Sequence, residues 1–114
     1  MINVEFYRNK SEEIYKFILS GHSDFGEEGN DVVCSAVSVL VINTVNCVEK
    51  FTDDGFSLTA DEKNGGYLEF EFSEKDKVSH DAGLLIKAME LGLLEIKNEY
   101  SCYIKINDGR CSKC

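Results

Sequence analysis

The sequence has no proline and no tryptophan, and basic residues are few. Its 114 residues include 12 Lys and Arg against 21 Asp and Glu, a formal net charge of −9. Because phosphate binding relies on Lys and Arg, this shortage argues against direct binding of nucleic acid. The same charge suits a basic protein or peptide as partner. With no repeat and no Ser/Gly-rich linker, we expect one domain over residues 1–106 and a polar C-terminal tail over 107–114.

Secretion and membrane signals are also lacking. The first residues have no basic region followed by an apolar stretch of signal-peptide length. The uncharged run at 32–48 would span about 25 Å as a helix, short of the roughly 30 Å of hydrocarbon in a bilayer. The cysteines number five, and an odd count in a chain without a signal is typical of reduced thiols. We therefore expect a cytoplasmic protein with no membrane partner.

Hydropathy patterning predicts the element order β-β-α-β-β-α-β. Alternation of apolar and polar residues indicates five strands, at 2–6, 14–19, 56–60, 67–72 and 100–106. Longer apolar segments at 32–50 and within 73–98 indicate helices. The fold class is α+β, with two helices packed on a mostly antiparallel sheet of four to five strands.

The two helices are expected to differ in how they are covered. The helix at 32–50 should be largely buried, with Asp31 as its N-cap. The second helix has an apolar core face with helical spacing, made of Val78, Ala82, Leu85, Ile86, Met89, Leu93 and Ile96. Leu84, Leu91 and Leu94 lie off that face, so either a neighbouring element covers them or they form a self-association surface.

The residues that could carry chemistry lie between 21 and 38. With Asp31 as cap, Cys34 falls in the first helical turn, where unpaired N–H groups and the helix dipole favour an anion. The carboxylate of Asp31 acts in the opposite direction, so a thiolate there needs His22 close by to take its proton. Ser38, one turn after Cys34 on the same face, could hydrogen-bond the sulfur or a substrate.

Each of these residues also has a plain structural interpretation. A lone cysteine in an apolar helix is often a small core residue, and the same holds for Cys47. A lone histidine in a loop is usually solvated, and His80 is expected to be a solvated helix residue. Spacing alone leaves catalysis and packing both open at Cys34.

Two other kinds of function compete with catalysis. The Gly-rich segment 21–30 is expected to be an exposed, mobile loop whose acidic residues could hold a basic client without cutting it. Cys102, Cys111 and Cys114 could bind a metal, since Cys111 and Cys114 have CxxC spacing, but a structural zinc site needs four ligands and no second pair exists. We therefore expect no metal and no cofactor.

A longer pattern around Cys34 resembles a known family. Gly21-His22, a loop of about ten residues and the octapeptide Asp-Val-Val-Cys-Ser-Ala-Val-Ser at 31–38 are similar to the ribosomal-processing cysteine proteases, the Prp family of Firmicutes and related bacteria. The likeness continues with Gly-Tyr-Leu at 66–68 and with Leu-Gly-Leu at 91–93. Ser23 and Ser35 stand where the family often has Ala, and the tail with Cys111 and Cys114 lies outside the shared pattern.

The resemblance implies a cysteine endopeptidase with Cys34 as nucleophile and His22 as general base. Gly21, Asp31 and Ser38 would support the site, and backbone N–H groups at the helix start would hold the oxyanion. The residue that orients His22 stays open. The resemblance further implies a homodimer, which agrees with the spare leucines. The partner it implies is a basic ribosomal protein precursor, namely large-subunit ribosomal protein twenty-seven, whose N-terminal extension is removed after a hydrophobic, aromatic-ending sequence.

Overall fold

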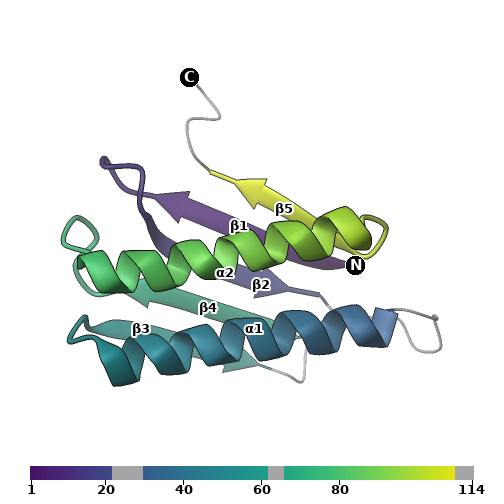
Figure 1. The fold of residues 1–114 in the computed structure, drawn as a ribbon, viewed down its shortest axis with the longest axis horizontal. Helices are drawn as coiled ribbons and strands as arrows, with labels where there is room; N and C mark the ends of the chain where they lie inside the picture. Colours follow the sequence, from purple (N-terminus) through teal and green to yellow (C-terminus); the bar gives the residue numbers. More distant parts are fainter. Residues whose placement is uncertain (22–29, 62–65, 110–114) are drawn as a thin grey trace.

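The computed structural model describes residues 1–21, 30–61 and 66–109. Its elements follow one another in the predicted order (Figure 1): β1 (Ile2–Arg8), β2 (Ile14–Ser20), α1 (Asn30–Phe51), β3 (Phe56–Asp61), β4 (Tyr67–Phe72), α2 (His80–Glu99) and β5 (Ile104–Asp108). The predicted α+β class and element order are confirmed.

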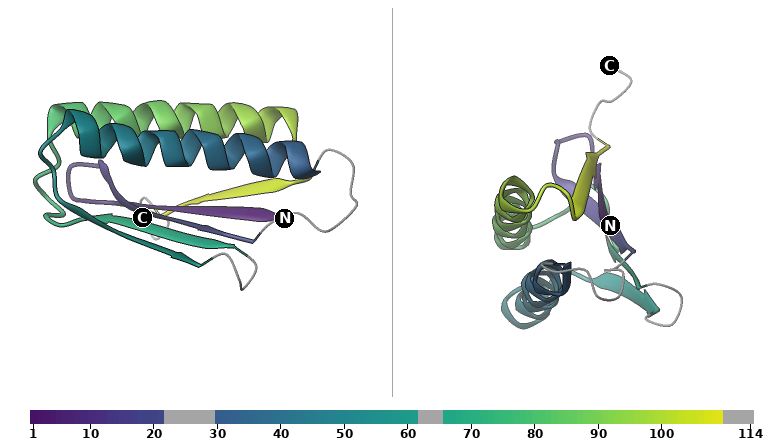
Figure 2. Two further views of the ribbon diagram at one scale, coloured as in Figure 1. Left: turned by 90° about the horizontal axis from the view of Figure 1, so that it is seen from below. Right: turned by 90° about the vertical axis from the view of Figure 1, so that its right-hand side faces the viewer.

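The five strands form one mixed sheet with the order β3-β4-β2-β1-β5. β1 and β5 pair in parallel, and the other three pairs are antiparallel. Both helices lie on one face of this sheet, with α1 beside β3 and β4 and α2 beside β1 and β2 (Figures 1 and 2). The described part of the chain therefore forms two layers, and none of its helices lies on the far face of the sheet.

Strand alternation decides which side chains meet the helices. In the row that crosses four strands, Leu19 of β2 pairs with Val4 on one side and Leu68 on the other. Leu68 in turn pairs with Ala60 of β3. The next row contains Phe17 and Phe70, whose rings stack with centroids 4.9 Å apart. Because successive side chains point to opposite faces, both rows lie on the side of the helices.

The helices complete the core with residues at helical spacing. α2 buries Ala82, Ile86, Met89 and Leu93, which confirms four of the seven predicted positions as buried. The other three, Val78, Leu85 and Ile96, are partly buried against the same core. α1 contributes a row of buried valines at 33, 37, 41, 45 and 48.

α1 departs from the prediction in two ways. It begins at Asn30, so Asp31 lies inside the helix and the expected N-cap role of Asp31 is wrong. The helix is also buried on one side only, because Val32, Val39 and Ile42 are exposed. By length and composition α1 could cross a membrane, a criterion that the core helix of a water-soluble protein also meets. Its buried valines account for much of this apolar character.

The C-terminal elements are bounded by specific hydrogen bonds. Ser79 is the N-cap of α2 and accepts a hydrogen bond from the Ala82 N–H at 3.1 Å. At the other end the Tyr100 N–H donates to the Ile96 carbonyl and the Tyr103 N–H donates to the Tyr100 carbonyl. This turn delays β5 until Ile104, four residues later than predicted. β5 then continues to Asp108, two residues into the segment expected as a tail.

Candidate active site

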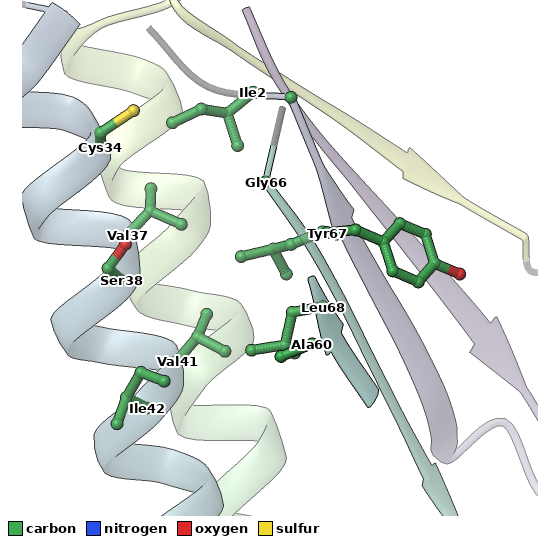
Figure 3. Close-up of a pocket in the computed structure, with 12 residues that line it drawn as sticks. Ile2, Cys34, Val37, Ser38, Val41, Ile42, Ala60, Gly66, Tyr67 and Leu68 are labelled. Atoms are coloured by element: carbon green, nitrogen blue, oxygen red, sulfur yellow. The ribbon is translucent and has the colours of Figure 1, made fainter. Parts of the chain in front are cut away.

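A cavity of about 340 Å³ lies between α1 and the sheet (Figure 3). Cavities that hold small ligands run from roughly 300 to 1,000 Å³, so this one can accept one or two side chains of a peptide. Its walls come from α1, β1, β2, β3 and β4, and the residues are Ile2, Leu19, Gly21, Cys34, Val37, Ser38, Val41, Ile42, Ala60, Gly66, Tyr67 and Leu68.

One wall is a single stripe of α1. Its residues lie at 34, 37, 38, 41 and 42, which is the spacing of one helical face. Cys34 lies at one end of this stripe, and its sulfur points away from the helix axis toward Ile2 and Gly66 (Figure 3). The half-buried thiol therefore faces the cavity, and the rest of the helical wall extends away from it in one direction.

The floor is the helix-facing side of the sheet. Leu19, Leu68 and Ala60 are cross-strand neighbours in one row. Ala60 is the smallest helix-facing side chain of β3, since the other two positions on that side of the strand are Phe56 and Leu58. The methyl group of Ala60 leaves room that a larger side chain would fill.

Two glycines lie at the Cys34 end of the cavity. Gly21 and Gly66 both have left-handed backbones, with φ values of 82° and 78°. The Gly21 N–H donates a hydrogen bond to the Gly66 carbonyl at 3.1 Å. A Cβ on Gly21 would lie 2.4 Å from the Met1 carbonyl oxygen. The chain can therefore pass this point only as glycine.

Among the described residues, the side chains that face the cavity are apolar apart from Cys34 and Ser38. Of its described lining residues only Cys34 and Tyr67 can ionise, and the Tyr67 ring points away from α1 (Figure 3). The Tyr67 hydroxyl donates a hydrogen bond to Glu69 at 2.7 Å, which raises the pKa of Tyr67 and lowers the pKa of Glu69. Among the described lining residues, the ionisable group that faces the cavity and could act as a nucleophile is thus the thiol of Cys34.

The structure brings together three of the five predicted site residues. Cys34, Ser38 and Gly21 line the same cavity. Asp31 lies in the first turn of α1, three residues before Cys34. His22 lies outside the described residues, as do the acidic side chains at 24, 27 and 28 and the predicted loop as a whole.

The start of α1 narrows which N–H groups at the helix start could hold an oxyanion. Because α1 begins at Asn30, Cys34 is its fifth residue, and only the first four N–H groups of a helix lack an acceptor within it. The N–H of Cys34 therefore belongs to the helical ladder. Within α1, the N–H groups that lack a helical acceptor lie before Cys34.

Several residues of the site could not be found from the sequence. Alternation placed Ile2, Leu19, Ala60 and Leu68 on strands, but it did not say that they lie across from Cys34. The one available signal was Ala60, a small residue in a row of large ones. The remaining described cysteines, Cys47 and Cys102, lie outside the cavity. No cluster of metal-binding side chains occurs within residues 1–21, 30–61 and 66–109, and Cys111 and Cys114 lie outside these ranges.

Comparison with known proteins decides the family. The sequence profile of the cysteine protease Prp family matches residues 1–105. The chain belongs to the cysteine protease Prp family. It is therefore a cysteine protease, and the predicted family resemblance is confirmed.

Relatives in the Prp family match the chain over nearly its whole length. The ribosomal processing cysteine protease Prp of Bacillus subtilis is 33% identical and the alignment covers 93% of this chain and 96% of the relative. The Prp of Staphylococcus aureus is 31% identical over 94% of this chain and 98% of the relative. The crystal structure of an essential Prp from S. aureus with a covalently linked product peptide is similar at a TM-score of 0.83 and 29% identity, over 95% of this chain and 99% of that one.

Proposed function

We propose that this Prp-family protease removes the N-terminal extension of large-subunit ribosomal protein twenty-seven, with Cys34 as nucleophile and His22 as general base. The observation that carries the proposal is the thiol of Cys34 at one end of an apolar cavity. An acyl segment with hydrophobic side chains, as the family resemblance implies, suits such a cavity. The S. aureus relative with a covalently linked product peptide supports covalent catalysis.

Support for His22 comes from chain connectivity. Gly21, to which His22 is bonded, lines the same cavity as Cys34. In the proposed reaction Cys34 attacks the scissile carbonyl while His22 accepts the thiol proton. His22 then protonates the leaving amine, and water hydrolyses the thioester with His22 as base. Ser38 and Gly21 line the site, and Asp31 lies one turn before the nucleophile.

Charge supports a basic substrate. The chain carries a formal charge of −9, and ribosomal protein precursors are basic, so long-range attraction would speed their encounter. The cavity itself has no charged wall among the described residues, so the positively charged part of the substrate would remain outside it. We place this reaction in the cytoplasm, with no membrane and no nucleic acid as direct partner.

The proposal includes a homodimer. Leu84, Leu91 and Leu94 of α2 are 57%, 60% and 39% exposed. This exposure excludes the alternative in which another described element of the same chain buries them. Val39 of α1 adds to the exposed apolar surface of the helix layer. A second copy that covers these side chains would remove them from water.

Incubation with the extended ribosomal protein precursor tests the reaction. The parent protein should shorten the precursor, and Cys34→Ala should lower the rate by at least about 10⁴-fold, because removing a nucleophile removes the covalent route. Cys47→Ala is the matched control, since Cys47 is a half-buried cysteine of the same helix outside the cavity. His22→Ala should also inactivate, and His80→Ala should not.

The alternative outcome identifies a binding module. If the parent and Cys34→Ala both hold the precursor and neither cuts it, the protein is a non-catalytic acidic module for a basic ribosomal protein.

Alkylation of Cys34 by iodoacetamide near neutral pH tests the dyad separately. The rate should fall in His22→Ala and stay unchanged in His80→Ala.

A further inference from the structure

The face of the sheet opposite the helices consists of polar and charged side chains, and none of the described helices lies on it (Figure 2). The ring of Tyr67 points to this side, away from α1 (Figure 3). The side chains that alternate with the core rows share this side of the sheet. Across β3, β4, β2 and β1 they form two rows, Thr59, Glu69, Ile18 and Glu5, and Ser57, Glu71, Lys16 and Tyr7. We refer to these two rows, together with Tyr67, as the open face.

A lysine of this chain shows which chemistry the open face can bind. The Lys16 ammonium group lies 3.4 Å from Glu69 Oε2 and 5.1 Å from the centroid of the Tyr7 ring. One cation is therefore held by a carboxylate and by the face of an aromatic ring at the same time. A lysine or arginine from another chain would find the same two kinds of group here.

Tyrosine hydroxyls orient the carboxylates of the open face. Tyr7 donates a hydrogen bond of 2.7 Å to Glu5. Tyr67 donates one of the same length to Glu69. The bond to Glu5 raises the pKa of Tyr7, and burial and the charges of Glu5 and Glu69 raise it further. Both carboxylates thus act on one region of the open face, and a bound cation would not have to order them.

The carboxylates of the open face are not all neutralised by its own lysine. Within the described residues no lysine or arginine forms an ion pair with Glu5 or Glu71. Glu5 and Glu69 flank Ile18 in one row, and because neighbouring strands lie about 4.8 Å apart, about 10 Å separates their backbones. A long basic side chain between them could lay its alkyl stem on Ile18 and its charged end on a carboxylate. The open face therefore suits a basic polypeptide.

The open face begins where the cavity ends. Gly66 lines the cavity at the Cys34 end, and the next residue, Tyr67, already directs its ring to the open face (Figure 3). From Gly66 to Glu71 an extended strand advances about 17 Å. A substrate whose scissile carbonyl lies at Cys34 can therefore reach the open face with the first residues of its leaving part.

We propose that the open face is a docking surface for a lysine- and arginine-rich segment on the leaving side of the cut, with Glu5, Glu69 and Glu71 binding its cations. The proposal rests on the proposed function for the identity of the substrate. The two parts of the substrate then bind to two surfaces: the apolar part in the cavity next to Cys34, and the basic part on the open face. Docking of this kind lowers KM for the whole precursor and leaves a short peptide unaffected.

Cleavage of two substrates tests the docking surface. One is the extended precursor, and the other is a synthetic peptide that spans the cut and ends before the basic segment. The double change Glu5→Gln and Glu71→Gln removes two charges and keeps an acceptor for the Tyr7 hydroxyl. At low salt it should lower kcat/KM for the precursor about fivefold, through KM, and leave kcat/KM for the peptide unchanged. At about 1 M salt the loss should disappear, because the charges are screened.

The matched control is the double change Glu95→Gln and Glu99→Gln. Both glutamates are exposed on α2, so the control removes the same net charge from the helix side of the molecule. It should keep the kcat/KM of the parent for both substrates. An equal loss in the two double variants would show that net charge alone attracts the precursor, and it would overturn the docking surface.

Cross-linking locates the contact in the parent protein, so it does not depend on how the variants fold. A lysine-rich peptide without a cleavage site is coupled to nearby carboxylates with a carbodiimide, and the linked residues are identified by mass spectrometry. The links should gather at Glu5, Glu69 and Glu71, and the peptide should inhibit cleavage of the precursor but not of the short peptide. Links confined to carboxylates outside the open face would overturn the proposal.

Binding to Cys34→Ala separates docking from the proposed catalysis. In that background the added Glu5→Gln and Glu71→Gln changes should weaken binding of the precursor about fivefold at low salt. Such a difference in binding, without any cleavage by the parent, would contradict the proposed catalysis and leave the docking surface intact. Cleavage by the parent together with an affinity that the double change does not alter would overturn the docking surface and leave the catalysis intact.

Discussion

Gly21 and Gly66 are joined by a backbone hydrogen bond of 3.1 Å at the Cys34 end of the cavity, and both have left-handed backbones. This contact links the end of β2 to the start of β4 next to Cys34. The positive φ of each residue favours glycine, and at Gly21 the nearby Met1 carbonyl oxygen also leaves no room for a Cβ. The preference of glycine for a left-handed backbone therefore helps to determine the shape of the cavity at its Cys34 end.

Substituting Gly21 should impair both stability and activity. Gly21→Ala places a methyl group 2.4 Å from the Met1 carbonyl oxygen and imposes a left-handed backbone on alanine. The left-handed conformation alone costs roughly 1–2 kcal/mol. We expect a lower free energy of unfolding in urea and a lower rate of precursor cleavage. Gly66→Asn should be milder than Gly66→Ala, because asparagine adopts left-handed backbones more readily; equal effects of the two would contradict this explanation.

Two glycines within α2 should respond in different ways to alanine. At Gly83 a Cβ would meet no atom closer than 3.8 Å, so Gly83→Ala should raise the free energy of unfolding by about 1 kcal/mol through helix propensity. At Gly92 the Cβ would lie 2.7 Å from Leu40 Cδ2 on α1, and Leu40 would have to move. Overpacking of this kind costs about 1–3 kcal/mol. In thermal and urea unfolding, Gly83→Ala should therefore be more stable than Gly92→Ala. The reverse order would show that α1 and α2 are not this close at Gly92.

Arg8 links β1, α2 and β5 through two carboxylates. Its guanidinium donates two hydrogen bonds to Asp108, at 2.9 and 2.8 Å, and one to Glu90 at 2.7 Å. Only 10% of the Arg8 side chain is exposed. Removing its charge leaves the partly buried carboxylates of Glu90 and Asp108 close to each other without their shared positive partner. Arg8→Met should lower the free energy of unfolding by about 2–4 kcal/mol.

The control for Arg8 is an exposed ion pair. Lys77 lies 3.5 Å from Glu74, and both side chains are largely exposed. Lys77→Met should leave the urea midpoint unchanged, because exposed ion pairs contribute little. A comparable loss in both variants would mean that net charge, and not the buried contact, explains the effect at Arg8.

The contact between Tyr67 and Glu69 predicts how stability depends on pH. The hydrogen bond from Tyr67 lowers the pKa of Glu69 below its ordinary 4.5. The stabilisation that this bond gives the folded state is therefore present above pH 4.5, and it is lost as pH falls through the lower pKa of the folded state. The same bond raises the pKa of Tyr67 above its ordinary 10.0. The stabilisation linked to the protonated hydroxyl is therefore present below pH 10.0, and it is lost as pH rises through the raised pKa of the folded state.

Tyr67→Phe isolates this contact. The difference in free energy of unfolding between the parent and Tyr67→Phe should be constant near neutral pH and should shrink in acid and in strong base. Urea titrations across this range measure it. A difference that does not change with pH would indicate that the hydroxyl contributes through packing alone.

Replacing exposed leucines tests the proposed homodimer. The double change Leu84→Lys and Leu91→Lys should yield a monomer with a retained fold, because both side chains face water in the single chain and lysine is tolerated there. Sedimentation equilibrium and circular dichroism measure the two properties. Ala88, an exposed residue one turn from both leucines, offers Ala88→Ser as a control that should remain dimeric. A parent protein that sediments as a monomer at all concentrations would contradict the dimer.

Local periodicity accounts for what could be predicted of the fold. The four buried residues of α2 recur at helical spacing, and the strands alternate, so both element types could be recognised. The C-terminal end of α2 depends on single hydrogen bonds, which is why Tyr100 ends this helix where a strand was expected. The periodicity of apolar residues does not predict such individual hydrogen bonds.

By itself the sequence determined the element order, the helix that carries Cys34 and the position of Ser38 one turn further on, because these properties depend on neighbours within a few residues. Only the tertiary structure decided that Ala60 and Leu68 lie across from that helix and that Leu84 and Leu91 remain exposed. The physical reason is that strand pairing and helix packing join segments far apart in the chain, and their partners follow from the packing of the whole core.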